Sequence, residues 1–131
     1  SLYLAVPLLG TPLTQAIYSE VGTLYRNIRT FPGPYGALPL TVVIVATEEL
    51  VWRELCVRGL LGFLSPAGTL VVATGLYASL QAAAHSFMLL SLAASCGIVW
   101  TWQRLQFGHW AVPFITHLMW DVAVFVLWPL Q

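Results

Sequence analysis

The charged residues of this chain are gathered in a small part of an otherwise apolar sequence. The 131 residues include five Lys or Arg and five Asp or Glu, and half of these ten charges lie between positions 48 and 58. Charged residues make up 8% of the chain, against roughly 25% in ordinary soluble domains. A soluble domain could not build a charged surface from so few groups. Together with 59% hydrophobic residues and a mean hydropathy of +0.82, this favours a helical integral membrane protein.

Net charge and cysteine usage narrow the function classes further. The formal net charge is zero, so the chain lacks the basic surface that nucleic acid binding requires. Cys56 and Cys96 each lie within an apolar run and predict neither a disulfide framework nor a metal-binding pair. The sequence begins at Ser1 without a basic segment, so we expect no signal peptide and interpret the chain as a fragment of a longer protein.

The apolar residues form blocks of about the length of a membrane helix. We predict four core helices at about residues 37–64, 67–87, 88–107 and 110–128. Each is close to the roughly 20 residues that cross a hydrocarbon core about 30 Å thick. Residues 13–30 place apolar and polar side chains on opposite faces of a helix, which is typical of the membrane interface. The predicted fold is all-α: a polytopic membrane helix bundle of about four core helices plus an interfacial helix, in a single domain over 1–131.

The charge between positions 48 and 58 conflicts with a membrane environment unless it is paired. One charged side chain at the centre of a membrane helix costs about 2.5–3.5 kcal/mol on insertion scales. Glu49 and Arg53 are four residues apart, as are Glu54 and Arg58, so each acid can pair with a base one turn later. A purely structural role stays open for the first pair and is favoured for the second. Glu48 has no base four positions on, so we expect its partner on another helix.

Three further polar residues lie in the predicted core helices. His85 follows three alanines, which permit close helix approach. His117 and Asp121 are four residues apart and therefore share one helix face. Because ionisable groups inside membrane segments are costly, they indicate a functional site by default.

Two motifs, with a histidine between them, match the pattern of a known family. "EELVWR" at 48–53 has the form EExxxR, "HLMWD" at 117–121 has the form HxxxN/D, and His85 ends an apolar stretch between them. This order resembles the CPBP family of intramembrane proteases, which includes the CAAX prenyl endopeptidases and the Abi-like, bacteriocin-processing relatives. The resemblance covers about residues 37–128, which we interpret as a CPBP-like catalytic core.

Three positions depart from the family pattern. The middle motif is usually FxxxH, but Gln81 stands four residues before His85. Trp52 replaces the common Phe before the arginine, which is a mild change. The third motif ends in Asp121, where many members carry Asn.

The resemblance implies hydrolysis of a peptide bond within or beside the membrane. It assigns Glu48 as the general base that activates water, with help from His85. It assigns Glu49 and Arg53 to an ion pair that fixes their helix. No cofactor is implied, and a glutamate-activated water is the favoured mechanism.

The resemblance assigns His117 and Asp121 to stabilising the tetrahedral oxyanion. Preset donors at such a position are worth about 3–4 kcal/mol each in comparable sites. An ionised carboxylate would repel an oxyanion, whereas an amide could donate to it. We therefore expect Asp121 to be protonated or hydrogen-bonded to His117, orienting the imidazole rather than contacting substrate.

Partners and alternatives follow from the same residues. The expected partners are membrane lipid and a peptide or protein substrate with a lipidated, leader or sorting-tail segment; the expected location is the bacterial inner membrane. Zinc remains an alternative because Glu, His and Asp are zinc ligands, although no HExxH motif is present. A non-catalytic membrane scaffold or immunity-type protein would keep the charges for stability. A proton-coupled transporter would use them as a relay.

Overall fold

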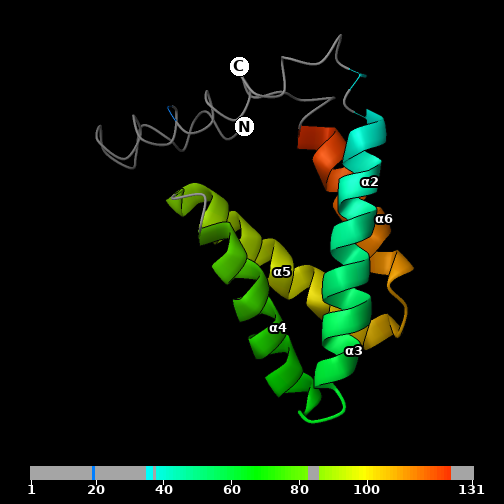
Figure 1. The fold of residues 1–131 in the computed structure, drawn as a ribbon, viewed down its shortest axis with the longest axis vertical. Coiled ribbons are helices and arrows are strands. Elements are labelled where there is room, and N and C mark those ends of the chain that lie inside the picture. Colours follow the sequence, from blue (N-terminus) through cyan, green and yellow to red (C-terminus); the bar gives the residue numbers. More distant parts are fainter. Residues whose placement is uncertain (1–18, 20–34, 37, 83–85, 125–131) are drawn as a thin grey trace.

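The computed structural model describes residues 19, 35–36, 38–82 and 86–124, and these residues form a helical assembly (Figure 1). Its elements are α2 (Leu38–Glu49), η3 (Leu50–Cys56), α3 (Val57–Leu60), α4 (Pro66–Gln81), α5 (Phe87–Phe107) and α6 (Ala111–Val122). α2, η3 and α3 follow one another without a break and form one long helix. No strand occurs among the described residues, so the predicted all-α class is confirmed for this part of the chain.

The helices meet around the middle of the long helix. α4 and α5 pack along each other as an antiparallel hairpin, and α6 packs against both α2 and α5 (Figure 1). The η3 segment contacts α4 as well as α5. Side chains near the junction of α2 and η3 can therefore reach three other helices.

Local sequence signals set the helix ends. The side chains of Ser65 and Ser86 each accept a hydrogen bond from the backbone N–H three residues later, which caps α4 and α5. Pro66 follows the first of these caps, where its missing N–H costs no helical hydrogen bond. Gly108 ends α5 in the left-handed region, with φ +71°, a conformation that glycine adopts without strain.

The structure differs from the sequence expectations at one helix boundary and in the length of the apolar helices. We expected the second helix to continue to Phe87, but α4 ends at Gln81 and α5 already begins at Phe87, because Ser86 caps it. No helix within the described residues is both long and apolar enough for a membrane crossing. The interfacial segment 13–30 lies, apart from Ser19, outside the described residues and stays a prediction.

The π-helical segment η3 keeps one face of the long helix buried. The buried positions of this helix are Val45, Glu49, Arg53 and Val57, which recur every four residues. In an α-helix each step of four turns about 40° beyond a full turn, so this face would drift by about 120° over three steps. A π-helix, with its i→i+5 hydrogen bonds, has wider turns and reduces that drift. The segment therefore holds both charged residues against the same neighbours.

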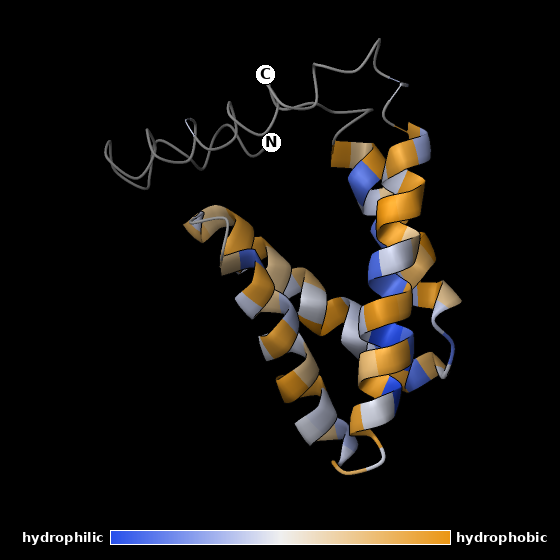
Figure 2. Cartoon of the chain, in the orientation of Figure 1, coloured by the Kyte–Doolittle hydropathy of each residue, from blue (hydrophilic) through white to orange (hydrophobic). Residues whose placement is uncertain are grey.

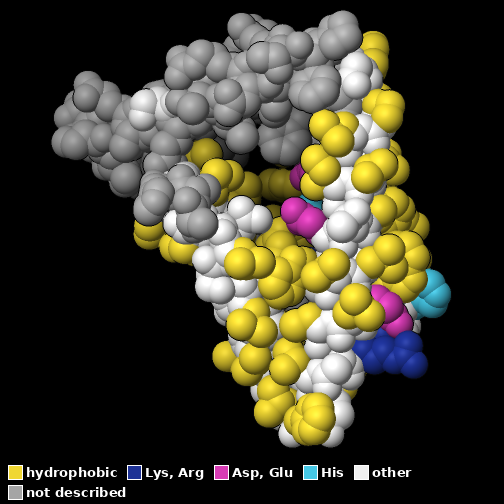
Figure 3. Space-filling view, viewed as in Figure 1, with side chains coloured by type: hydrophobic (Ala, Val, Ile, Leu, Met, Phe, Trp, Pro, Cys, Tyr) yellow, Lys and Arg dark blue, Asp and Glu magenta, His cyan; other side chains and the backbone are white. Residues whose placement is uncertain are grey.

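Two charged side chains are buried as deeply as the apolar residues around them. Arg53 and Glu49 are the largest fully buried side chains in the described part of the chain. Apolar residues are spread over every helix (Figure 2), and many lie at the surface (Figure 3). Phe63, in the turn after α3, is 91% exposed. The apolar core is a small cluster of Tyr77, Ala93 and Trp100, with Trp52 and Cys96 packed against it.

Candidate active site

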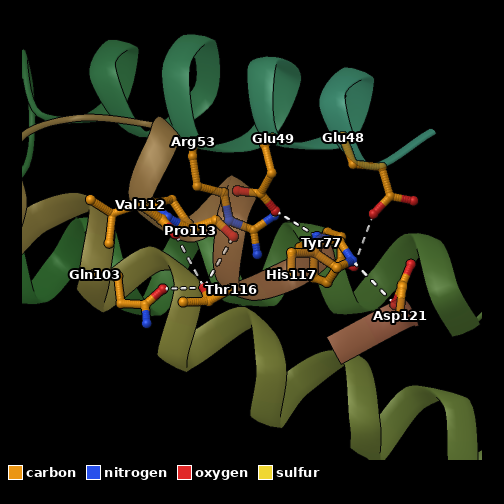
Figure 4. Close-up of polar contacts among 10 residues, drawn as sticks. All are labelled: Glu48, Glu49, Arg53, Tyr77, Gln103, Val112, Pro113, Thr116, His117 and Asp121. Carbon is orange, nitrogen blue, oxygen red and sulfur yellow. Dashed lines mark hydrogen bonds and ion pairs between the residues drawn. The ribbon is translucent and has the colours of Figure 1, made fainter. Parts of the chain in front are cut away.

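Glu49 lies at the centre of a buried polar cluster that joins three helices. It is the last residue of α2, and none of its surface is exposed. Its Oε1 lies 3.2 Å from Nη1 of Arg53, one turn later, and 2.8 Å from Nδ1 of His117 in α6 (Figure 4). The first contact is the ion pair that the i,i+4 spacing predicts. The second joins residues 68 positions apart and links the long helix to α6.

Two neighbours fix the orientation of the His117 imidazole. Besides the contact of Nδ1 with Glu49, the ring stacks on Trp100 of α5, with centroids 3.6 Å apart and planes inclined by 19°. These contacts leave Nε2 on the side of Asp121, whose Oδ1 lies 3.8 Å away. That distance suits an ion pair but is too long for a hydrogen bond. Glu49 and Trp100 therefore orient this ring. Of the two alternatives predicted for Asp121, the hydrogen bond with His117 is not formed, and protonation of Asp121 stays a prediction.

α6 is also held against α5 at the residue before His117. The Thr116 hydroxyl lies 2.7 Å from Oε1 of Gln103 in α5, a short hydrogen bond (Figure 4). It fixes the register of α6 on α5 beside the site. His117 is thus positioned by its own contacts and by its neighbour's.

The Arg53 guanidinium is buried between aromatic rings. Its carbon lies 4.7 Å from the ring centroid of Tyr77 and 5.3 Å from that of Trp100, while 1% of its surface is exposed. Its nitrogens have no hydrogen-bond partner with suitable geometry within the described residues. The electrostatics therefore rest on the Glu49 carboxylate and on the negative faces of the two rings.

Glu48 contacts α4, whereas its neighbour Glu49 contacts α6. Successive residues of a helix point about 100° apart, and Figure 4 shows the two carboxylates well separated. The Tyr77 hydroxyl in α4 donates a hydrogen bond of 3.2 Å to Glu48 Oε2. Glu48 is partly buried, so one of its faces reaches the surface of the described assembly. The expectation that its partner lies on another helix is confirmed.

A second carboxylate cluster lies one turn further along the helix. Glu54 accepts a hydrogen bond of 3.0 Å from Arg58 and one of 3.1 Å from Arg104 in α5. The Arg58 side chain is 75% exposed and the Glu54 side chain 25% exposed. This cluster connects the long helix to α5 at the surface, as its predicted structural role requires.

The structure brings together some of the predicted site residues and leaves others apart. Glu49, Arg53 and His117 are in direct contact, and Asp121 lies beside His117. Glu48 contacts none of these three through a hydrogen bond in the described part of the chain, and its partner is a tyrosine. His85 lies outside the described residues, so its place in the site stays a prediction.

Sequence reasoning missed Tyr77 and Trp100. Both rings contact Arg53, and each also touches one of the predicted site residues, Glu48 or His117. Aromatic residues in apolar helices usually belong to the core, and neither position carries a motif. The one available signal was that Glu48 needed a donor from another helix.

The described residues contain no group of three or more His, Cys, Asp or Glu side chains that could hold a metal ion. His117 lies between two acids, with Glu49 beside its Nδ1 and Asp121 beside its Nε2.

The buried cluster thus joins Glu49 and Arg53 of the long helix to His117 of α6. A model of the family described as type II CAAX prenyl endopeptidase Rce1-like matches residues 31–123, more than half of the chain and all six predicted site positions. The chain belongs to this family, which confirms the resemblance to the CPBP and CAAX proteases. No curated protein and no solved structure gives a significant match.

Proposed function

We propose that this chain is the catalytic core of an intramembrane endopeptidase, in which Glu48 activates the water that attacks a peptide bond. The observation that carries the proposal is the division of labour between two adjacent acids. Glu49 is fully buried and contacts Arg53 and His117 through Oε1, whereas Glu48 is partly accessible and accepts a hydrogen bond from Tyr77. The family match over residues 31–123 supports peptide hydrolysis as the reaction.

Glu48 is the acid suited to proton transfer. A general base must come within hydrogen-bond reach of a water molecule, at about 2.6–3.2 Å. Glu49 is fully buried and its Oε1 is already engaged by two cations or donors, so a substrate water has no path to it. The hydrogen bond from Tyr77 uses Oε2 of Glu48 alone. In this mechanism His85 assists Glu48 at the same water.

His117 is the group suited to stabilising the oxyanion. Because Glu49 is paired with Arg53 and accepts, Nδ1 of His117 carries a proton. Nε2 lies on the opposite side of the ring from Glu49, and it can donate to an oxyanion when it carries a proton. Asp121, 3.8 Å from Nε2, acts through His117 and not by touching substrate.

The proposed location is a bacterial inner membrane, and the proposed substrate carries a lipidated, leader or sorting-tail segment. Support for contact with lipid comes from the apolar surface of the described helices (Figure 3). Phe63, Phe87, Val71 and Leu55 are each at least 69% exposed. An apolar surface of this extent favours an apolar surrounding. In this proposal a lipid-borne tail reaches Glu48 from the surrounding lipid.

The test compares wild type with Glu48→Gln in membranes, using three coexpressed reporter proteins that carry a prenylated tail, a leader peptide or a sorting tail. The amide keeps the shape but cannot accept the water's proton, so cleavage should fall by about 10²–10⁴-fold. Glu54→Gln is the matched control, because it makes the same chemical change on the same helix outside the site. It should cleave like wild type at equal abundance.

The alternatives are distinguished in the same assay. Unchanged cleavage with Glu48→Gln, or no cleavage of any reporter by wild type, would overturn the mechanism and leave the membrane scaffold or immunity-type role. A zinc chelator is added to a wild-type sample. If it abolishes cleavage, metal-activated water replaces the glutamate mechanism.

A further inference from the structure

Tyr77 is held in place by contacts to its ring and by a hydrogen bond from its hydroxyl. The side chain is 6% exposed, and its ring packs edge-on to Trp52 with centroids 5.7 Å apart. The Arg53 guanidinium lies 4.7 Å from the ring centroid. The hydroxyl then reaches Oε2 of Glu48 at 3.2 Å. A buried tyrosine normally finds some hydrogen-bond partner, but this one ends on the acid that the proposed function uses as its base.

The direction of this hydrogen bond matters for the chemistry. A phenol O–H donates and a carboxylate oxygen accepts, so Oε2 is held by Tyr77 while Oε1 is left to take a proton from water. The hydrogen bond also fixes the carboxylate rotation, because Oε2 is bound to a buried group. The second oxygen then has one defined direction in which to meet a water molecule.

A glycine on the neighbouring helix determines where the Tyr77 ring can lie. A Cβ at Gly97 of α5 would come within 3.1 Å of Cδ1 of Tyr77 and within 3.4 Å of Cγ2 of Thr74. The first distance is tighter than nine in ten real Cβ contacts, so the ring would have to shift by a few tenths of an ångström. Glycine is a poor helix former, yet it stands near the middle of α5, where close approach of α4 requires it.

We infer that Tyr77, seated on Gly97, is a positioning residue for Glu48, and the inference rests on the proposed function. Tyr77 acts through the Glu48 carboxylate and not on the substrate. Loss of its hydroxyl should therefore slow the reaction of bound substrate without weakening substrate binding. Displacement of its ring by a methyl group at position 97 should act through the same hydroxyl.

The experiment is a kinetic cycle on the full chain in vesicles, using the reporter that wild type cleaves. Tyr77→Phe keeps the ring and its packing while removing the donor. A hydrogen bond to a charged group corresponds to about 10- to 100-fold, so we expect kcat to fall by about 10-fold or more with KM nearly unchanged. Gly97→Ala should lower kcat by a smaller factor. In the double variant, Gly97→Ala should add nothing to Tyr77→Phe, because its target is already gone.

Gly75→Ala is the matched control for the glycine substitution. Gly75 is exposed on α4, and no atom lies within 4 Å of a Cβ built there. The added methyl group should leave kcat and KM at the wild-type values. A large effect at this position would mean that any alanine in this hairpin disturbs the enzyme, and would overturn the argument from Gly97.

The outcomes separate this inference from the function on which it rests. Wild-type kcat in Tyr77→Phe, with Glu48→Gln inactive, overturns the role of Tyr77 and leaves the proposed function standing. A rise in KM at constant kcat places Tyr77 in substrate binding and overturns the inference. If Glu48→Gln is active, both fall together. Should Tyr77→Phe fail to accumulate, Gly97→Ala decides: an unchanged kcat overturns the inference and a lowered kcat, with Gly75→Ala normal, supports it.

Discussion

Two carboxylates on the long helix have the same local pattern and different surroundings. Glu49 pairs with Arg53, and Glu54 pairs with Arg58, each acid four residues before its base. Arg53 is 1% exposed, whereas the Arg58 side chain is 75% exposed. The sequence spacing is identical, so spacing predicts that both ion pairs form. Burial determines how much each pair contributes to the free energy of unfolding.

Each carboxylate also reaches a second partner on another helix, and these two partners differ in kind. Glu49 meets His117, whose imidazole nitrogens can donate or accept a hydrogen bond. Glu54 meets Arg104, whose charge is permanent. The first arrangement can take part in proton chemistry, whereas the second can only hold α5 to the long helix.

The largest expected effect is that of Arg53→Ala. Removal of the base leaves the fully buried Glu49 carboxylate without its main counter-charge. Breaking a buried pair in this way typically costs about 3–5 kcal/mol, so we expect the thermal midpoint in detergent to fall by roughly 10 °C or more. Thermal unfolding followed by circular dichroism measures the shift. A loss no larger than that of Arg58→Ala would contradict the claim that burial separates the two clusters.

Arg104→Ala should have an intermediate effect. Arg104 is 9% exposed, and its Nη2 donates a hydrogen bond to Glu54, which keeps Arg58 as a second partner after the change. Because the acid stays paired and partly hydrated, we expect a fall of only a few degrees in the same measurement. Peptidase activity at equal abundance should be retained, since no site residue loses a contact. Activity lost while the fold stays intact would mean that α5 transmits an effect to the site.

Much of the fold and of the pairing could be predicted from the sequence, because both depend on local spacing. The i,i+4 pairs, the separation of Glu48 from any base on its own helix, and the all-helical class all follow from a 3.6-residue period. The end of the second helix, predicted at residue 87, is wrong, because apolar spacing does not show that Ser86 caps the next helix.

The cross-helix contacts were beyond sequence reasoning for a physical reason. Glu49 and His117 are 68 residues apart, and two adjacent acids offer no sign of which one will face that histidine. Which acid faces His117 depends on helix packing and on the π-helical segment that follows Glu49. The residue types of that segment do not predict its i→i+5 hydrogen bonds. The family match covers the motif residues but not the roles of Tyr77 and Trp100, which carry the cluster through ring contacts.

Arg58→Ala should have the smallest effect, and it gives the clearest contrast with Arg53→Ala. This side chain is largely exposed, so water screens its attraction to Glu54, and its removal leaves Arg104 in place. We expect the thermal midpoint to change by no more than about a degree. The small difference should shrink further as salt rises, because the Debye length falls from about 10 Å at 0.1 M to about 3 Å at 1 M. The contrast with Arg53→Ala should persist in high salt, since a buried pair is screened much less. If salt reduced both effects equally, the Glu49 pair would be hydrated, and its assignment as the dry support of His117 would be wrong.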